Sequence, residues 1–200
     1  MQFNETKARV HDHGGPPDEF LTELVEWARS AHDEIFARTE TVGSRDIYNK
    51  VFAELGPYEN LLHRKAVMLE VMRVLAGFES SWDWKEGVDV SRLGIDTPEN
   101  AEAGAWQVSY DSRHLAPGLW TLLLAHDVKN GVTFQKAMKF DHPLAMEYVA
   151  CLMRHNTKHN GPLYKGDERL AIRRSLRNPE HSIYPWLSHN AVLEFESLLT

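Results

Sequence analysis

A long apolar segment in the middle of the chain constrains the fold more than any other feature. Residues 60–78 carry apolar side chains on more than one face of a helix, most densely from Val67 to Phe78. A helix that is apolar on all sides is normally buried. Glu70 and Arg73 interrupt the run, and it is too short to span a membrane. The pattern therefore predicts a buried central helix.

Other segments also have the apolar spacing of helices. They cover residues 18–35, 47–55, 117–128, 133–140, 143–158 and 186–199. Between Trp82 and Pro98, glycine and aspartate alternate with short β-prone pieces, which predicts a loop or small hairpin. The expected fold class is mainly α, a single helical domain with a small loop or hairpin insertion after the central helix.

Chain length and composition predict one domain preceded by a short arm. Two hundred residues suit a single domain with a sizeable core. Residues 1–16 are polar and contain two histidines followed by Gly14-Gly15-Pro16, which predicts a flexible N-terminal arm. Residues 17–200 are expected to form the domain.

Charge and cysteine content exclude several classes of protein. The net charge is −7 and no cluster of lysine and arginine is dense enough to follow a phosphate backbone, so we expect no nucleic-acid partner. No membrane partner is expected either, because no apolar run reaches membrane-spanning length. Cys151 is the only cysteine, which excludes an internal disulfide and a thiolate zinc site.

The end of the central helix is the first candidate for chemistry. Glu79 follows the apolar segment directly and precedes the polar, tryptophan-containing stretch Ser80–Trp84. A carboxyl group beside apolar side chains loses solvation for its charged form, so its pKa rises and it can carry a proton near neutral pH. Hydrolysis of a bond between sugars requires such a general acid, and Trp82 could cover a sugar ring.

A second stretch combines small residues with groups suited to sugars. In Gly104–Tyr110, the small residues Gly104 and Ala105 allow close approach of a backbone or ligand. They are followed by groups that could stack on or hydrogen-bond a glycan, and these are Trp106, Gln107, Ser109 and Tyr110. An ordinary contact between helices is the alternative interpretation of the same residues.

Together the two stretches resemble the lysozyme-like superfamily, in particular goose-type lysozymes and soluble lytic transglycosylases. Glu79-Ser80 is similar to the Glu-Ser motif of that family, and Gly104–Gln107 to its Gly-Leu-Met-Gln motif, with Ala-Trp in place of Leu-Met. The resemblance implies cleavage of β-1,4 bonds in peptidoglycan by a muramidase or lytic transglycosylase, with Glu79 as general acid. It implies no metal and no organic cofactor.

The identity of a second carboxylate is open. A hydrolase needs one, either to activate water or to stabilise the sugar cation, whereas the family's lytic transglycosylases use a hydroxyl group of the substrate. Asp89 is the first choice, because its loop could fold back over Glu79. Glu102, beside the glycine-containing stretch, is the second choice. Ser80 and His159 are further candidates for contacts with the glycan.

The resemblance also implies a location and leaves partners open. No basic segment followed by an apolar one is seen at the N-terminus, so we expect no signal peptide. A protein made in the cytoplasm would then reach the cell wall through a dedicated export system or phage lysis. The predicted partner is peptidoglycan or a related aminosugar polymer such as chitin, and any inhibitor or immunity protein is unknown.

Two functions from other classes compete with this interpretation. His155 and His159 are four residues apart near the end of a predicted helix, as in a metal-dependent hydrolase. The chain lacks the His-Glu-x-x-His pattern of many metalloproteases, the Gly-x-Ser-x-Gly pattern of serine hydrolases and phosphate-binding glycine loops. The second alternative is a non-catalytic structural or glycan-binding module in which Glu79 merely ends a helix.

Overall fold

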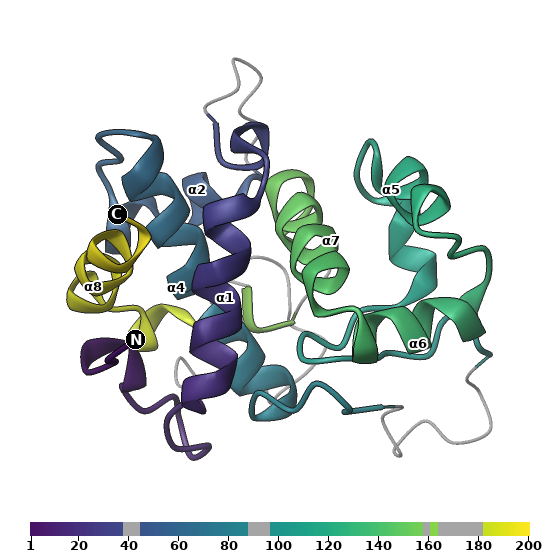
Figure 1. Ribbon diagram of the computed structural model, residues 1–200, viewed down its shortest axis with the longest axis horizontal. Coiled ribbons are helices and arrows are strands. Elements are labelled where there is room, and N and C mark those ends of the chain that lie inside the picture. The colour runs from purple at the N-terminus through teal and green to yellow at the C-terminus, as the bar shows by residue number, and fades with distance from the viewer. Residues whose placement is uncertain (38–44, 88–96, 158–160, 164–181) are drawn as a thin grey trace, which may run out of the picture.

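The computed structural model describes residues 1–37, 45–87, 97–157, 161–163 and 182–200 (Figure 1). Within these ranges the protein is mainly helical, as predicted, and the β-pairing consists of one isolated antiparallel bridge between Ala103 and Val108. None of the helices in the described ranges combines the length and apolar character needed to cross a lipid bilayer.

Eight α-helices lie in the described residues. They are α1 (Asp18–Ser30), α2 (Ile47–Lys50), α3 (Phe52–Leu55), α4 (Leu61–Ser80), α5 (Leu119–Ala125), α6 (Gly131–Phe140), α7 (His142–His155) and α8 (His189–Leu199). Short 3₁₀ turns are η1 (Glu5–Lys7), η2 (Asp33–Ile35), η4 (Tyr110–His114), η5 (Gly161–Leu163) and η8 (Tyr184–Trp186).

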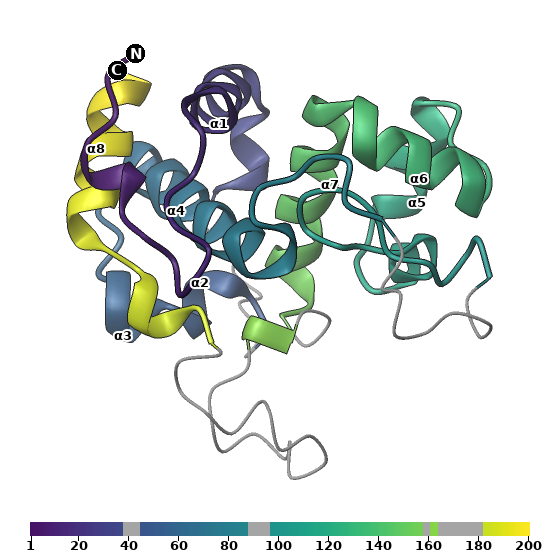
Figure 2. The same cartoon turned by 90° about the horizontal axis from the view of Figure 1, so that it is seen from below.

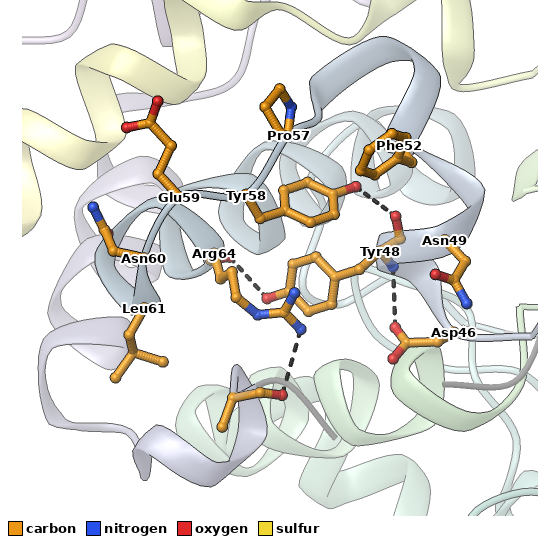
Figure 3. A pocket seen from close by; sticks show the side chains of 11 residues that line it. Asp46, Tyr48, Asn49, Phe52, Pro57, Tyr58, Glu59, Asn60, Leu61 and Arg64 are labelled. Carbon is orange, nitrogen blue, oxygen red and sulfur yellow. Dashed lines mark hydrogen bonds between the residues drawn. The ribbon is translucent and has the colours of Figure 1, made fainter. Parts of the chain in front are cut away.

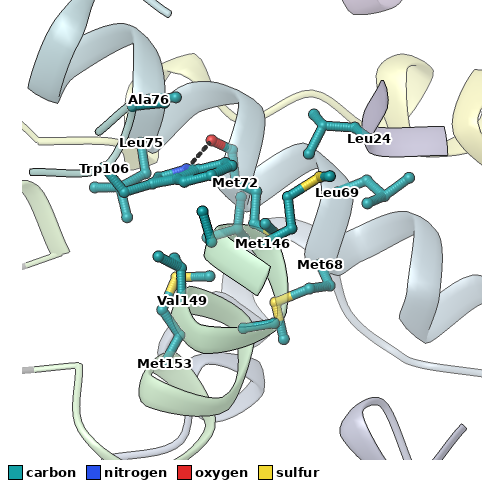
Figure 4. Close-up of a cluster of buried hydrophobic side chains, with 14 of the residues drawn as sticks. Leu24, Met68, Leu69, Met72, Leu75, Ala76, Trp106, Met146, Val149 and Met153 are labelled. Carbon is teal, nitrogen blue, oxygen red and sulfur yellow. Dashed lines mark hydrogen bonds between the residues drawn. The ribbon is translucent and has the colours of Figure 1, made fainter. Parts of the chain in front are cut away.

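Helix α4 is the central helix that the apolar segment predicts. Every residue from Ala66 to Gly77 is buried. Helices α1 and α8 pack against it and against each other, and Figure 2 shows the three helices side by side. Figure 4 shows Met68 and Met72 of α4 gathered with Met146 of α7 in the core. Burial on all sides explains why the sequence here has no polar face.

Helices α5, α6 and the turn η4 form a second group that packs against α7. Both views of the ribbon place this group on the far side of α7 from α8 (Figures 1 and 2). Trp84, which follows the end of α4, contacts helices on two sides: its ring lies 5.3 Å from that of Phe20 in α1 and 3.9 Å from that of His142 in α7. The end of α4 therefore lies where the helices around α4 meet the second group around α7.

Local hydrogen bonds set the helix ends, which differ from the sequence expectations by several residues. Helix α1 ends at Ser30, whose hydroxyl donates to the carbonyl of Trp27 (3.0 Å), and residues up to Ile35 form the separate turn η2. The expected helix over 47–55 is divided at Val51. Asp46 caps the start of α2, where its side chain accepts a hydrogen bond from the Tyr48 amide (3.0 Å).

The N-terminal segment 1–16, expected to be a flexible arm, instead packs against the domain. Phe3 and Val10 are buried, and the backbone amides of Asn4 and Thr6 donate to Glu194 of α8 at 2.8 and 2.7 Å. Two interactions hold this polar segment against the domain. Its two apolar side chains are buried, and the Glu194 carboxylate of α8 accepts hydrogen bonds from its backbone. The polar composition alone does not reveal this contact.

A buried ion pair lies in the middle of α4. Arg73 and Glu70 are fully buried and joined by two hydrogen bonds of 2.7 and 2.8 Å. The Arg73 guanidinium also donates to the carbonyl of Ala8 (2.9 Å), and Glu70 accepts from the amide of Ser188 (2.9 Å). The pair therefore connects both ends of the chain to the central helix.

We expect Arg73→Met to lower the free energy of unfolding by about 3–5 kcal/mol, because Glu70 would remain buried without its partner. Arg9 and Asp12 form a matched control, an exposed pair with the same spacing along the chain. Arg9→Met should cost less than about 1 kcal/mol. Urea unfolding measures both values, and equal losses would contradict the role assigned to the buried pair.

Candidate active site

Glu79 lies in the last turn of α4 and is half-buried. Burial removes water from its carboxyl group, and the neighbouring negative charge of Glu102 adds to this effect. Together they raise the pKa of Glu79 from 4.5 to about 8. The folded protein therefore holds a protonated carboxyl group at neutral pH, as the sequence pattern predicts for a general acid.

The chain turns sharply directly after this helix. Ser81 and Trp82 both adopt the left-handed backbone conformation, with φ of 55° and 64°. The Ser81 amide donates to the carbonyl of Gly77 and the Trp82 amide to that of Ala76, each at 3.2 Å. Glu79 is thus held in a helix whose end is fixed by hydrogen bonds.

Glu102 belongs to a tight turn that is attached to the end of α4. It precedes Ala103, which pairs with Val108 across the isolated bridge. The hydroxyl of Ser80 donates to the carbonyl of Ala105 at 2.8 Å, so the turn is bonded to the residue next to Glu79. This bond explains how two carboxyl groups more than twenty residues apart interact in the folded protein.

Gly104 is required for the same turn. Its φ is 75°, a conformation that side-chain-bearing residues rarely adopt, and an added Cβ would lie 2.5 Å from the carbonyl oxygen of Met138. Of the two groups that the small residues could admit, a backbone or a ligand, the structure shows the backbone of α6 in close approach.

Trp82 and Trp106, both predicted to stack on a sugar ring, are buried in the protein instead. They are only 4% and 1% exposed. The indole of Trp82 donates to the carbonyl of Arg73 at 2.8 Å, and that of Trp106 donates to the carbonyl of Met72 at 2.9 Å (Figure 4). Both rings therefore belong to the core, and their polar groups bind the backbone of α4.

Gln107, Ser109 and Tyr110 are also buried and bonded within the protein. The Gln107 amide donates to the carbonyl of Gly104 at 2.8 Å, and the Tyr110 hydroxyl donates to that of Lys129 at 2.7 Å. The carbonyl of Ser109 accepts from a hydroxyl group in η4. These residues build the turn that carries Glu102, so their predicted contacts with substrate are replaced by structural roles.

Two other candidates, Asp89 and His159, lie outside the described residues. His155, the second histidine of the alternative metal site, is exposed, and its Nδ1 atom lies 3.1 Å from the carbonyl oxygen of Cys151. Across the described ranges, no three side chains of histidine, cysteine, aspartate or glutamate are grouped so that they could hold a metal ion.

Two histidines of the N-terminal segment lie near the candidate site, although no sequence motif predicts this contact. The rings of His11 and His13 lie 5.8 and 6.3 Å from that of Phe78, the residue before Glu79. The Nδ1 atom of His13 is 2.7 Å from the hydroxyl oxygen of Ser81. Only the fold brings these groups together, because almost seventy residues separate them in the sequence.

No known protein family, curated protein or solved structure matches this chain.

We expect Glu79→Gln to change how stability depends on pH. The unfolded chain ionises Glu79 near pH 4.5, whereas the folded protein retains the proton up to about pH 8. Between these values the native state binds the extra proton, so wild-type stability should fall relative to the variant as pH rises, by at most about 1.4 kcal/mol per pH unit. Urea unfolding from pH 4 to 9 measures the difference. The exposed Glu86→Gln serves as control, and a profile for Glu79→Gln parallel to wild type would contradict the raised pKa.

A second variant separates the two causes of the raised pKa. Glu102→Gln removes the neighbouring charge but leaves Glu79 buried, so we expect the pKa of Glu79 to fall without reaching its ordinary value. NMR titration of the side-chain carboxyl carbons would follow this directly. An unchanged pKa for Glu79 would mean that the two groups do not interact.

Proposed function

We propose that this protein is a lysozyme-like glycosidase that cleaves β-1,4 bonds of peptidoglycan, with Glu79 as general acid. The observation that supports this most is the half-buried carboxyl group of Glu79, whose pKa is raised to about 8 at the end of a buried helix. Such a group carries its proton at neutral pH and can transfer it to a leaving oxygen.

In the proposed reaction, Glu79 donates its proton to the oxygen between two sugars as the glycosidic bond breaks. Positive charge then develops on the sugar ring. The ionised carboxylate of Glu102 would stabilise that charge or guide a water molecule to the ring. The raised pKa of Glu79 and the neighbouring charge of Glu102 support different proposed roles for the two groups, Glu79 as the acid and Glu102 as the base.

The arrangement of the chain agrees with this proposal. Glu79 lies on a long buried helix, and Glu102 lies on a turn bonded to that helix through Ser80. Groups on regular, hydrogen-bonded elements hold their positions better than groups on free loops. The motif pair that resembles goose-type lysozymes and lytic transglycosylases thus lies at the junction of the two helix groups.

Release of fragments from purified peptidoglycan tests the proposal. We expect Glu79→Gln to lower the rate by about 10²–10⁴-fold, because the amide has no proton to transfer. The activity of the wild type should be lost as pH rises through about 8, where Glu79 gives up its proton. Glu86→Gln, a change of an exposed acid just beyond the turn, should leave the rate unchanged. Equal product release by wild type and Glu79→Gln, or no release by either, would contradict the proposed function.

Mass spectrometry of the same products distinguishes the two reactions that Glu79 could support. Reducing ends indicate hydrolysis, and anhydro-sugar ends indicate transglycosylation. Glu102→Gln should stop a hydrolase that depends on this carboxylate, whereas a transglycosylase would lose less activity because the substrate supplies the attacking hydroxyl group.

A further inference from the structure

A cavity at the opposite end of α4 has the size of a small-molecule site. It measures about 630 Å³ and lies between the short helices α2 and α3 and the first turn of α4 (Figure 3). Pockets that bind small molecules usually enclose about 300–1,000 Å³. Tyr48, Phe52, Tyr58 and Arg64 supply much of its wall.

Arg64 is a buried cation in this wall that lacks a carboxylate partner. Its guanidinium lies 3.7 Å from the centre of the Tyr48 ring and donates to the carbonyls of Phe36 and Ala37. No ion pair joins it to an acidic side chain in the described part of the chain. Burial lowers the pKa of Arg64, which is the expected effect of removing water from a charge. A buried charge of this kind favours an anion.

The acidic side chains near Arg64 do not fully neutralise its positive charge. Asp46 is the buried acid of the same wall, and it is joined to Arg154 at 3.2 Å and accepts from the Tyr48 amide. Two arginines thus share one carboxylate. Glu59 also lines the cavity but is exposed, and Figure 3 shows its carboxylate directed away from the Arg64 guanidinium. The amino end of a 20-residue helix adds positive potential.

The rest of the wall is aromatic and apolar. The hydroxyl of Tyr48 donates to the carbonyl of Arg64 at 2.8 Å, and that of Tyr58 donates to the carbonyl of Tyr48. Because both hydroxyls are used within the protein, the tyrosines offer ring surface rather than hydroxyl donors. Phe52 is 55% exposed and packs edge-on against the Tyr58 ring. A ligand that fits this wall needs an apolar body as well as a negative charge.

We propose that this cavity binds a small organic carboxylate, with Arg64 as its counter-ion and with Phe52 and Tyr58 packing against its apolar body. A guanidinium can pair with a carboxylate through parallel N–H groups, which gives both charge and direction to the contact. The fifteen-residue separation along α4 puts this site about 22 Å from Glu79. The site therefore does not depend on the proposed glycosidase chemistry.

Calorimetric titration of the full chain with benzoate tests this proposal. We expect saturable binding with a Kd of about a millimolar or below, given the small size of the probe. Benzamide has the same shape without the charge and should bind at least about tenfold more weakly. Inorganic phosphate has charge without an apolar body and should also bind more weakly. Absence of saturable benzoate binding, or an affinity for benzamide or phosphate equal to that for benzoate, overturns the proposal.

Variants assign the binding to this cavity. Arg64→Lys keeps the charge but loses the planar guanidinium, and we expect benzoate affinity to fall about tenfold or more. Phe52→Ala removes an exposed ring without disturbing the core and should also weaken binding. Arg113→Lys is the matched control, because Arg113 stacks on Tyr110 at 3.9 Å but is already paired with Asp111. Unchanged affinity in both Arg64→Lys and Phe52→Ala, or an equal loss in Arg113→Lys, overturns the proposal.

Discussion

The ion pair between Glu70 and Arg73 is the interaction on which the rest of the structure depends. Both side chains are fully buried in the middle of α4, where an unpaired charge would be very costly. Arg73 also binds the carbonyl of Ala8, and Glu70 binds the amide of Ser188. Segments from the two ends of the chain are thereby fixed to one turn of the central helix, and the hydrophobic core closes around them.

The same part of α4 also fixes the surroundings of Glu79. The carbonyls of Met72 and Arg73 accept hydrogen bonds from the indoles of Trp106 and Trp82. One indole comes from the turn that follows Glu79, and the other comes from the turn that carries Glu102. These two hydrogen bonds attach both turns to the buried helix α4 and so hold Glu79 and Glu102 in position. Glu79 thereby stays buried and close to Glu102, and both conditions raise its pKa.

The sequence predicts the elements that depend on local pattern. The buried helix and the burial that raises the pKa of Glu79 follow from the apolar residues that precede it, and Gly104 itself indicates a site of close approach. Trp82 and Trp106 could not be placed in this way, because their partners are backbone carbonyls on α4 that local sequence does not reveal. The hydrogen bonds that anchor Asn4 and Thr6 also depend on a distant residue, Glu194 of α8. Only the fold brings Glu102 next to Glu79, whereas Asp89, the first choice for a second carboxylate, lies outside the described residues.

The ionisable side chains of α4 differ in the partners that they have in the folded protein. In the middle of the helix, Glu70 and Arg73 neutralise each other, and backbone groups of Ala8 and Ser188 complete their hydrogen bonds. At the amino end, Arg64 is buried without a carboxylate, and at the carboxyl end Glu79 faces the like charge of Glu102. Burying an ionisable group without an opposite charge costs stability, and such groups are candidates for binding or catalysis. The two proposed sites of this chain therefore lie at the two ends of α4, whereas the ion pair in its middle stabilises the fold.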